Sequence, residues 1–188
     1  MPPADIVVKR PGPRPFPRVG FALDTNKYIL GAYDRKELDV VLWTDTSGPL
    51  LGISLKASMS GLAKNINNRW EEMVGDAANL HSRFPMLSLG YFMVLPFVTP
   101  NGERVIGKNG RPTELGMTFV RKLRGVGHRV SPTDLVSEYE HVALAAIDFD
   151  RDVPRLHRRF PARQSGVRVE DFFDRLVQTF RGRNEYLG

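Results

Sequence analysis

The sequence predicts an α/β fold in which a central mixed β-sheet is flanked by α-helices. Two strand-like runs come first, at residues 38–43 and 50–56. Hydrophobic residues then recur at three- and four-residue steps from Leu62 to Leu80, which is typical of an amphipathic helix. Two nearly continuous apolar runs follow, at residues 87–98 and 141–149, and runs of this length are typical of buried strands.

The first two runs are predicted to form an antiparallel hairpin. Residues 38–43 (LDVVLW) are rich in strand-forming side chains, and residues 44–49 (TDTSGP) have the composition of a turn. Residues 50–56 (LLGISLK) return as the second strand, because so short a connection favours antiparallel neighbours. The helix after the hairpin is expected to start at Ser60 and to end before Pro85.

The second half of the chain is predicted to alternate helices with the two buried strands. Residues 99–112 are polar and Gly-rich, which indicates a loop, and residues 113–124 and 132–138 are expected to be helical. A terminal helix is predicted over residues 168–181. Its apolar face is expected to contain Phe172, Phe173, Leu176, Val177 and Phe180.

The chain of 188 residues is long enough for one domain with a substantial core. Residues 1–19 are rich in Pro and Arg, so they are predicted to form an extended arm ahead of a single domain over residues 20–188. No run approaches the roughly 18 apolar residues of a membrane span, and the N-terminus lacks the apolar core of a secretory signal. The expected location is therefore the cytoplasm, without a membrane partner.

Composition narrows the chemistry that the chain can perform. There are 27 Lys and Arg against 21 Asp and Glu, a net charge of +6, and a basic surface suits a polyanionic partner. The absence of cysteine excludes disulfides and thiolate metal sites, so any metal must bind oxygen or imidazole ligands.

Asp39 and Lys56 are the first candidate catalytic residues. Phosphodiester hydrolysis uses a metal that polarises the phosphate and activates water, and often a Lys near that water. A hairpin can supply a carboxylate from one strand, and a main-chain carbonyl with a Lys from the other. Asp39 lies inside the first predicted strand and Lys56 ends the second. Alternatively, Asp39 simply points outward to solvent, and Lys56 is a solvated strand end.

The helix after the hairpin carries a polar stripe beside its apolar face. At 100° per residue the stripe contains Asn65, Asn68, Arg69, Glu72 and Asp76, while Glu71 lies on the opposite flank with Asn67. Asparagine is a poor helix former, so three of them in four positions favour a helix start that faces DNA, where amides and Lys64 can contact phosphates or base edges. The other interpretation is a solvated face with local Arg–Glu pairing.

The segment ISLKASMSGLAKNINNRWEEMVGDAANLHSRFP, placed after ELDVVLW, resembles type II restriction endonucleases of the PD-(D/E)xK superfamily. The resemblance covers residues 37–98, and its most specific part is the Asn-Asn-Arg-x-Glu-Glu run. It implies a restriction-endonuclease-like fold with a central mixed sheet between helices. It also implies a Mg²⁺-dependent endonuclease, with Mn²⁺ as an expected substitute, that acts on double-stranded DNA.

Carried over by position, Asp39 matches the first metal-binding aspartate and Lys56 the catalytic lysine. Ser54 stands where an acidic residue is usual, and Leu38 stands where a proline usually precedes the aspartate. Some restriction enzymes also have Ser-x-Lys there and take the missing ligand from a helical glutamate. The resemblance then implies that Asp39, the Leu55 carbonyl and a helical glutamate hold the metal. Glu72 is preferred as this glutamate, with Glu71 as the alternative.

Other functions remain open at this point. The missing acid at Ser54 favours a non-catalytic DNA-binding or assembly module that keeps the nuclease fold, and a structure-specific repair or mobile-element nuclease is a further alternative. Cutting both strands at a symmetric site would imply a homodimer. The residues expected to contact DNA are Lys64, Asn65, Asn67, Asn68, Arg69, Lys108 and Arg111.

Overall fold

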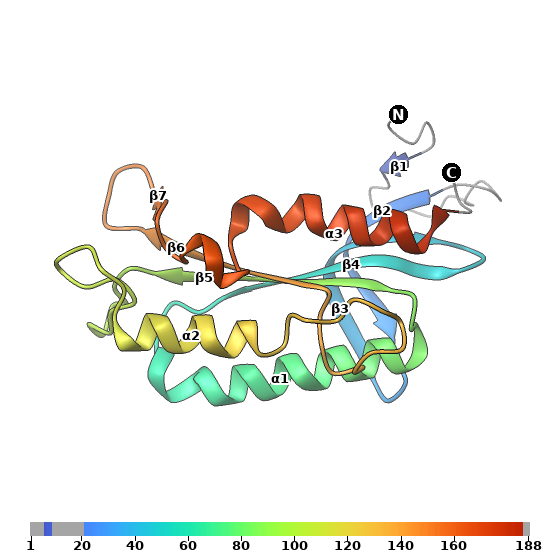
Figure 1. Cartoon of the computed structure of the whole chain (residues 1–188), viewed down its shortest axis with the longest axis horizontal. Coiled ribbons are helices and arrows are strands. Elements are labelled where there is room, and N and C mark those ends of the chain that lie inside the picture. Colours follow the sequence, from blue (N-terminus) through green and yellow to red (C-terminus); the bar gives the residue numbers. More distant parts are fainter. Residues whose placement is uncertain (1–5, 9–20, 186–188) are drawn as a thin grey trace.

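The computed structural model describes residues 6–8 and 21–185, and these form an α/β fold with a mixed sheet (Figure 1). In this part of the chain the sheet has seven strands in the order β1-β2-β3-β4-β5-β6-β7. The strands are β1 Ile6–Val8, β2 Phe21–Leu30, β3 Arg35–Thr44, β4 Gly48–Ala57, β5 Ser88–Pro96, β6 His141–Asp148 and β7 Arg155–Leu156. The helices are α1 Leu62–Arg83, α2 Glu114–Arg124 and α3 Val169–Arg183, with a short 3₁₀ turn at Arg163–Ser165.

Strand directions follow from the connections between them. Tight turns join β2 to β3 and β3 to β4, and both pairs are antiparallel. The α1 and α2 crossovers make β4, β5 and β6 parallel, so the carboxyl ends of these three strands share one edge of the sheet. The outer pairs differ from each other, because β1 runs parallel to β2 whereas β7 runs antiparallel to β6.

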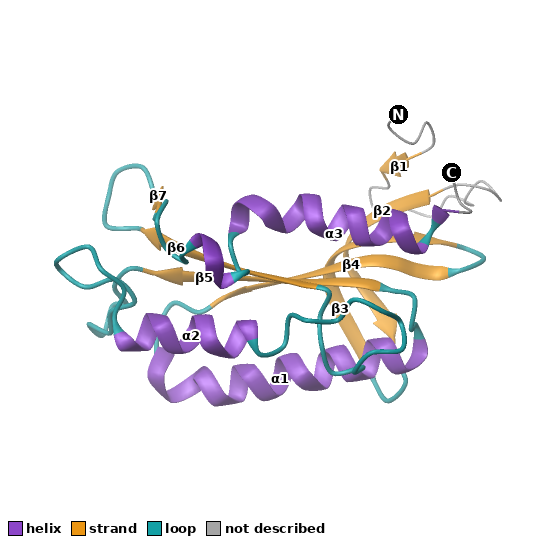
Figure 2. Cartoon of the chain, in the orientation of Figure 1, coloured by secondary structure: helices purple, strands orange, loops and turns teal. Residues whose placement is uncertain are grey.

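Helices cover both faces of the sheet (Figure 2). The larger core lies under α1 and α2 and includes Leu80, Phe119 and the β3 residue Val41. The smaller core lies under α3, where Phe172 and Leu176 pack against β4, β5 and β6. Gly90 on β5 permits this close approach, since a Cβ there would lie 2.7 Å from the Phe172 Cζ atom.

Most predicted elements are present, with three corrections. The hairpin, both buried strands and the helices after Gly61, Thr113 and Arg168 are confirmed. The first helix begins at Leu62 rather than Ser60. The terminal helix buries Phe172 and Leu176, but it leaves Phe173 and Val177 exposed. The helix predicted at residues 132–138 is wrong. The backbone there forms turns, held by hydrogen bonds from the Val130 and Ser131 amides to the Asp134 carboxylate.

The first strands were not predicted from the sequence. β2 pairs with β3 along most of its length, although Asp24, Asn26 and Lys27 interrupt its hydrophobic pattern. Within the predicted arm of residues 1–19, Ile6–Val8 forms β1, and the rest of the arm lies outside the described residues.

Candidate functional site at the open end of the hairpin

β3 and β4 separate at the end where the candidate catalytic residues lie. The paired residues run from Thr44↔Gly48 to Val40↔Ile53. Beyond this point β4 continues beside β5 as far as Ala57, while β3 continues beside β2 back to Arg35. The hairpin is therefore open over the last residues of β4.

Asp39 occupies the point of separation. Its Oδ2 accepts a hydrogen bond of 2.6 Å from the Leu55 amide, so the carboxylate replaces a ladder bond that the separated strands no longer make. The β2–β3 register omits the Asn26–Asp39 pair, and Asn26 has a left-handed φ of 51°. Asp39 is half-buried as a result.

Ser54 and Lys56 lie on the β4 face that is turned toward α1. Leu51 and Ile53 on the same strand belong to the core under α3. Because side chains alternate along a strand, Ser54 and Lys56 point toward the opposite face. The Ser54 side chain is buried, and its Oγ has no hydrogen-bond partner among the described residues. The Lys56 Nζ atom lies 3.8 Å from the Glu72 Oε1 atom.

Glu72 is the centre of a cluster of charges between α1 and the sheet. Its Oε2 accepts a 2.6 Å bond from Arg69, and its Oε1 lies 3.6 Å from the Lys36 Nζ atom as well as near Lys56. Lys36 also pairs closely with Asp76, one turn further along α1. Two carboxylates and three cations thus share a half-buried site next to the open end of the hairpin.

The two carboxylates of this cluster differ in proton affinity. Burial raises the pKa of Glu72, but the Arg69 hydrogen bond and the charges of Lys36 and Lys56 outweigh it, so the pKa lies below its ordinary value. At Asp76 burial prevails over the Lys36 hydrogen bond and charge, and the pKa is raised. Glu72 is consequently the group that stays ionised, and Asp76 is the one that takes up a proton more readily.

Tyr91 forms the buried floor of the same cluster. It pairs with Ser54 in the β4–β5 register, and its hydroxyl has no hydrogen-bond partner in the described part of the chain. Burial raises its pKa, and the neighbouring charge of Glu72 raises it further. The phenol therefore remains protonated near neutral pH and can donate a hydrogen bond into the cluster.

Glu72 and Glu71 lie in different environments, although they are adjacent in the sequence. Glu72 faces Lys56, whereas Glu71 is exposed on the outer side of α1. Lys36 was not identified from the sequence, because its part in the cluster depends on which face of β3 turns toward α1. Among residues 6–8 and 21–185, no hydrogen bond or ion pair joins Asp39 to Lys56 or Glu72, and no three His, Asp or Glu side chains gather as a metal site.

The predicted DNA contacts divide into two groups. Arg69 is engaged by Glu72, and Asn65 is half-buried. The others are exposed on the first turns of α1 or on the loop over residues 99–112: Lys64, Asn67, Asn68, Lys108 and Arg111. Glu103 fixes this loop to the start of α1, because its carboxylate accepts 2.8 Å bonds from the Leu62 and Ala63 amides.

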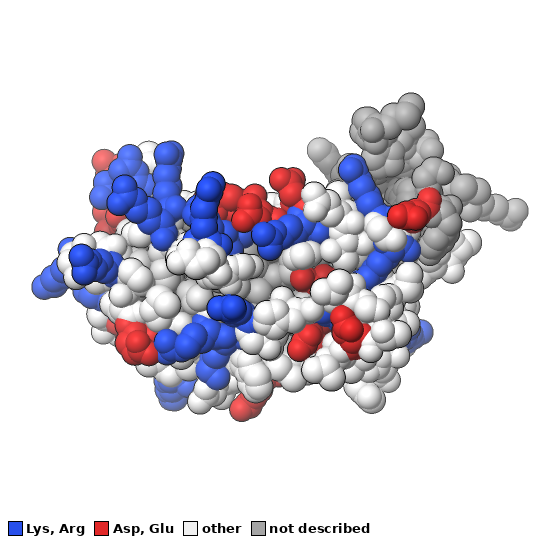
Figure 3. All heavy atoms as spheres, viewed as in Figure 1, with Lys and Arg blue, Asp and Glu red and all other residues white. Residues whose placement is uncertain are grey.

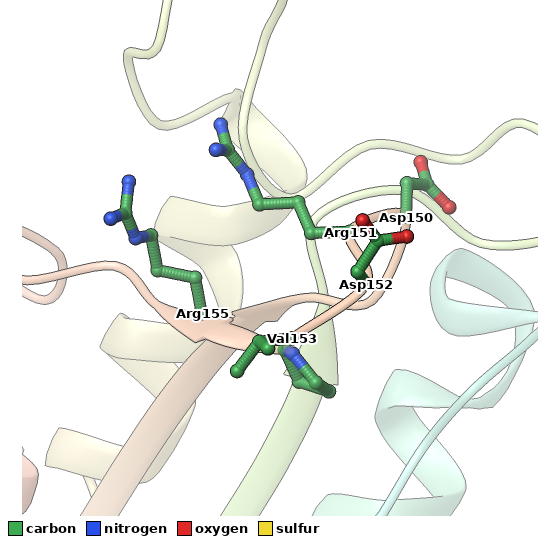
Figure 4. Close-up of a pocket in the computed structure, with 6 residues that line it drawn as sticks. Asp150, Arg151, Asp152, Val153 and Arg155 are labelled. Carbon is green, nitrogen blue, oxygen red and sulfur yellow. The ribbon is translucent and has the colours of Figure 1, made fainter.

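The loop over residues 99–112 is the first basic loop of this region. A second basic loop follows the carboxyl end of β6 and lies beside the first. The His157 Nε2 atom is 3.3 Å from the Gly110 carbonyl oxygen and joins the two loops. Figure 3 shows Lys and Arg gathered at this end of the molecule and along α2. The loop borders an open hollow of about 480 Å³, and Figure 4 shows the Arg151 and Arg155 side chains extending in the same direction, away from Asp150 and Asp152. Arg158 and Arg159 are also exposed on this loop.

No protein-family model, no curated protein and no solved structure matches this chain. Within the described ranges, none of the helices has the length and apolar character needed to cross a membrane.

Proposed function

We propose that this chain is a Mg²⁺-dependent endodeoxyribonuclease of the type II restriction class that cuts double-stranded DNA. The observation that carries the proposal is the open end of the hairpin. There Asp39 bonds the Leu55 amide, and Lys56, the next residue, pairs with Glu72 of α1. A carboxylate on β3, a Lys on β4 and a helical carboxylate thus occupy adjoining elements, as the sequence resemblance implies.

The architecture is consistent with a restriction-endonuclease-like fold, which is part of the proposal. The mixed sheet has helices on both faces, and the hairpin is followed by α1 and then by the buried strand β5. Lys36 and Tyr91 would add a charge and a hydrogen-bond donor to the same site.

The donor set fits Mg²⁺ in type. This cation binds oxygen ligands and commonly uses only one or two protein carboxylates together with water and substrate phosphate. Asp39, Glu72 and the Leu55 carbonyl would hold it, and when bound it polarises the scissile phosphate and lowers the pKa of a water molecule. Glu72 supplies from α1 the negative charge that Ser54 lacks.

The side chains of the chain itself would orient the reactants. Lys56 places a positive charge beside Glu72, where it can orient the attacking water and stabilise negative charge that develops on the phosphate. The two basic loops stand at the carboxyl ends of β5 and β6, the same edge of the sheet at which Lys56 ends β4. Lys108 and Arg111 could therefore hold the DNA backbone while the hairpin acts on it.

A non-catalytic DNA-binding module is the second candidate. It is favoured by the state of the two carboxylates: Asp39 is already bonded to the Leu55 amide, and Glu72 is surrounded by Lys36, Lys56 and Arg69. A repair or mobile-element nuclease that recognises DNA structure would use the same residues. It differs from a restriction enzyme in the substrates that it cuts.

The test is cleavage of supercoiled plasmid and phage DNA with Mg²⁺, Mn²⁺ or EDTA. We expect metal-dependent cutting that falls about 100-fold or more in Lys56→Ala, Asp39→Asn and Glu72→Gln, as for the loss of a catalytic group. Glu71→Gln is the matched control, since it removes the same charge from the exposed neighbour, and it should retain activity.

Two outcomes would redirect the proposal. A DNA mobility shift in EDTA without strand breaks under any metal would leave the binding module. Equal loss of activity in Glu71→Gln and Glu72→Gln would remove the special role of Glu72. Discrete fragments from phage DNA would support a site-specific restriction enzyme, and selective cutting of branched or flapped DNA would support a structure-specific nuclease.

A further inference from the structure

A cavity of about 370 Å³ lies near the amino end of β6, whereas Lys56 lies near the carboxyl end of β4. It is bounded by the end of α2, the first residues of β6, the turn before α3, and α3 itself. Figure 1 shows α2 and α3 on opposite faces of the sheet, so the cavity lies along the outer edge of β6. Because β4, β5 and β6 are parallel, the amino end of β6 and the carboxyl end of β4 lie at opposite ends of these strands.

The cavity exists because the neighbours of β6 are short. β7 pairs only with Ile147 and Asp148. The turn before α3 contributes one bond to this edge, from the Leu144 amide to the Val167 carbonyl. In the described part of the chain, no strand lies beside the start of β6 on this side, and the space is left to side chains.

Positively charged side chains dominate the lining. Arg124 at the end of α2 and Arg175 on α3 both line the cavity, and neither forms an ion pair with a described residue. Arg129 lies deeper and is 1% exposed. Glu140 is the only acidic residue of the lining.

Glu140 does not neutralise this charge. Its Oε1 accepts 2.6 Å bonds from both Arg129 and Arg183, and its Oε2 accepts a 2.7 Å bond from the Leu89 amide. One carboxylate therefore faces two buried guanidinium groups, which leaves a net positive charge beneath the cavity. Burial of unbalanced charge is unfavourable, so an anion in the cavity would be stabilised.

One unused donor points to the same kind of ligand. The Arg129 Nε atom is buried and has no hydrogen-bond partner among residues 6–8 and 21–185. His141 lies 2.9 Å from the Thr179 hydroxyl, and both residues line the cavity. Burial, and then the charge of Arg175, lowers the pKa of His141, so its ring adds no positive charge to the cavity near neutral pH.

We propose that this cavity binds a phosphate monoester of mononucleotide size. Arg124 and Arg175 supply the charge at the rim, and Arg129 supplies it at the base. Guanidinium groups suit phosphate because their N–H groups match its oxygens, and the volume falls within the roughly 300–1,000 Å³ of small-ligand pockets. The phosphate could belong to a free nucleotide or to the 5′ end of a DNA strand.

The experiment is calorimetric titration of the full chain at low ionic strength. The ligands are inorganic phosphate, a nucleoside 5′-monophosphate, and one oligonucleotide with and without a 5′-phosphate. We expect saturable binding of the monophosphate, or of the phosphorylated oligonucleotide in preference to the unphosphorylated one. Which of the two binds identifies the source of the phosphate.

Variants assign the binding to the cavity. Arg124→Gln and Arg175→Gln should each weaken it about tenfold or more, as expected for losing one charge-assisted bond. Arg181→Gln is the matched control, because Arg181 is exposed on α3 but does not line the cavity. Binding that is equally weakened by Arg181→Gln, or that ignores the 5′-phosphate and the monophosphate, would overturn the proposal. The test does not involve DNA cleavage, so its result is independent of the proposed nuclease activity.

Discussion

The side chain of Asn79 fixes the turn between β2 and β3. Its Oδ1 accepts hydrogen bonds of 2.8 and 3.1 Å from the Tyr33 and Asp34 amides, and its Nδ2 donates one of 2.8 Å to the Asp34 carbonyl. The turn comes so close to α1 that a Cβ on Gly31 would lie 2.3 Å from the Asn79 Oδ1 atom. One residue near the C-terminal end of α1 therefore positions the start of β3, the strand that carries Lys36 and Asp39.

Replacing Asn79 with Ala should destabilise the protein by about 3 kcal/mol, because three hydrogen bonds are lost at roughly 1 kcal/mol each. The measurement is the free energy of unfolding in urea. Asn67→Ala is the control, since Asn67 is exposed on the same helix and its loss should change stability by no more than about 0.5 kcal/mol. Equal effects of the two substitutions would contradict the role of the Asn79 side chain.

At the scale of the element, the N-cap residue of α1 has no side chain that could cap the helix. Its N-cap residue, Gly61, has a left-handed φ of 60°. The first free amides of the helix, those of Leu62 and Ala63, are instead satisfied by Glu103 from the loop after β5. The helix that carries Glu72 is thus tied to the loop that carries Lys108 and Arg111.

Glu103→Ala should lower the free energy of unfolding by about 1 kcal/mol, as for the loss of a helix cap, and Glu103→Gln by less. The Ala63 and Leu62 amides lower the pKa of Glu103. A lowered folded-state pKa means that the carboxylate stabilises the fold above its ordinary pKa and that this contribution is lost as the pH falls. The difference between wild type and Glu103→Ala, measured by urea unfolding, should therefore shrink in acid. A difference independent of pH would contradict capping by the carboxylate.

Elements whose hydrophobic residues recur with a clear period could be predicted from the sequence, whereas elements held in place by polar contacts could not. α1, α3 and the two buried strands carry their apolar pattern in the local sequence. β2 does not, since Asn26 adopts a left-handed conformation that breaks the alternation. Likewise, the turns after Ser131 depend on Asp134, and the place of Lys36 in the charge cluster depends on how β3 twists against α1. The placement of Asp39, Lys56 and Glu72 on adjoining elements could be predicted because the hairpin and the helix that carry them were predictable.

For the molecule as a whole, Glu140 joins distant parts of the chain. It contacts Arg129 before β6 and Arg183 at the end of α3, and the His81 Nε2 atom on α1 is 3.3 Å away. Burial opposes its ionisation. The hydrogen bond and charge of His81, the charge of Arg183 and the Leu89 amide nevertheless lower its pKa from 4.5 to about 2.

The stability contributed by the ionised Glu140 should be complete above pH 4.5 and should be lost as the pH falls toward 2. A shift of this size corresponds to about 3 kcal/mol. Urea unfolding of wild type across this range should show the loss, and Glu140→Gln should be less stable at neutral pH and should lack that part of the pH dependence. Carboxyl NMR titration of wild type gives the same pKa directly. A Glu140 pKa at or above 4.5 would contradict the prediction.

The strand order of the sheet matches the order of the strands in the sequence. Among the described strands, each new one therefore pairs with an edge that the preceding segment has already provided, and none has to insert between two strands already in place. Each of these strands therefore pairs with its predecessor in the sequence, which keeps the sequence separation between paired strands smaller than in a sheet with a permuted order. Among the described helices α3 comes last in the sequence, and it packs on Leu51 and Ile53 and brings Arg183 to Glu140. A nascent chain that has not yet added α3 would expose the apolar face formed by these two residues, and exposed apolar surface favours aggregation.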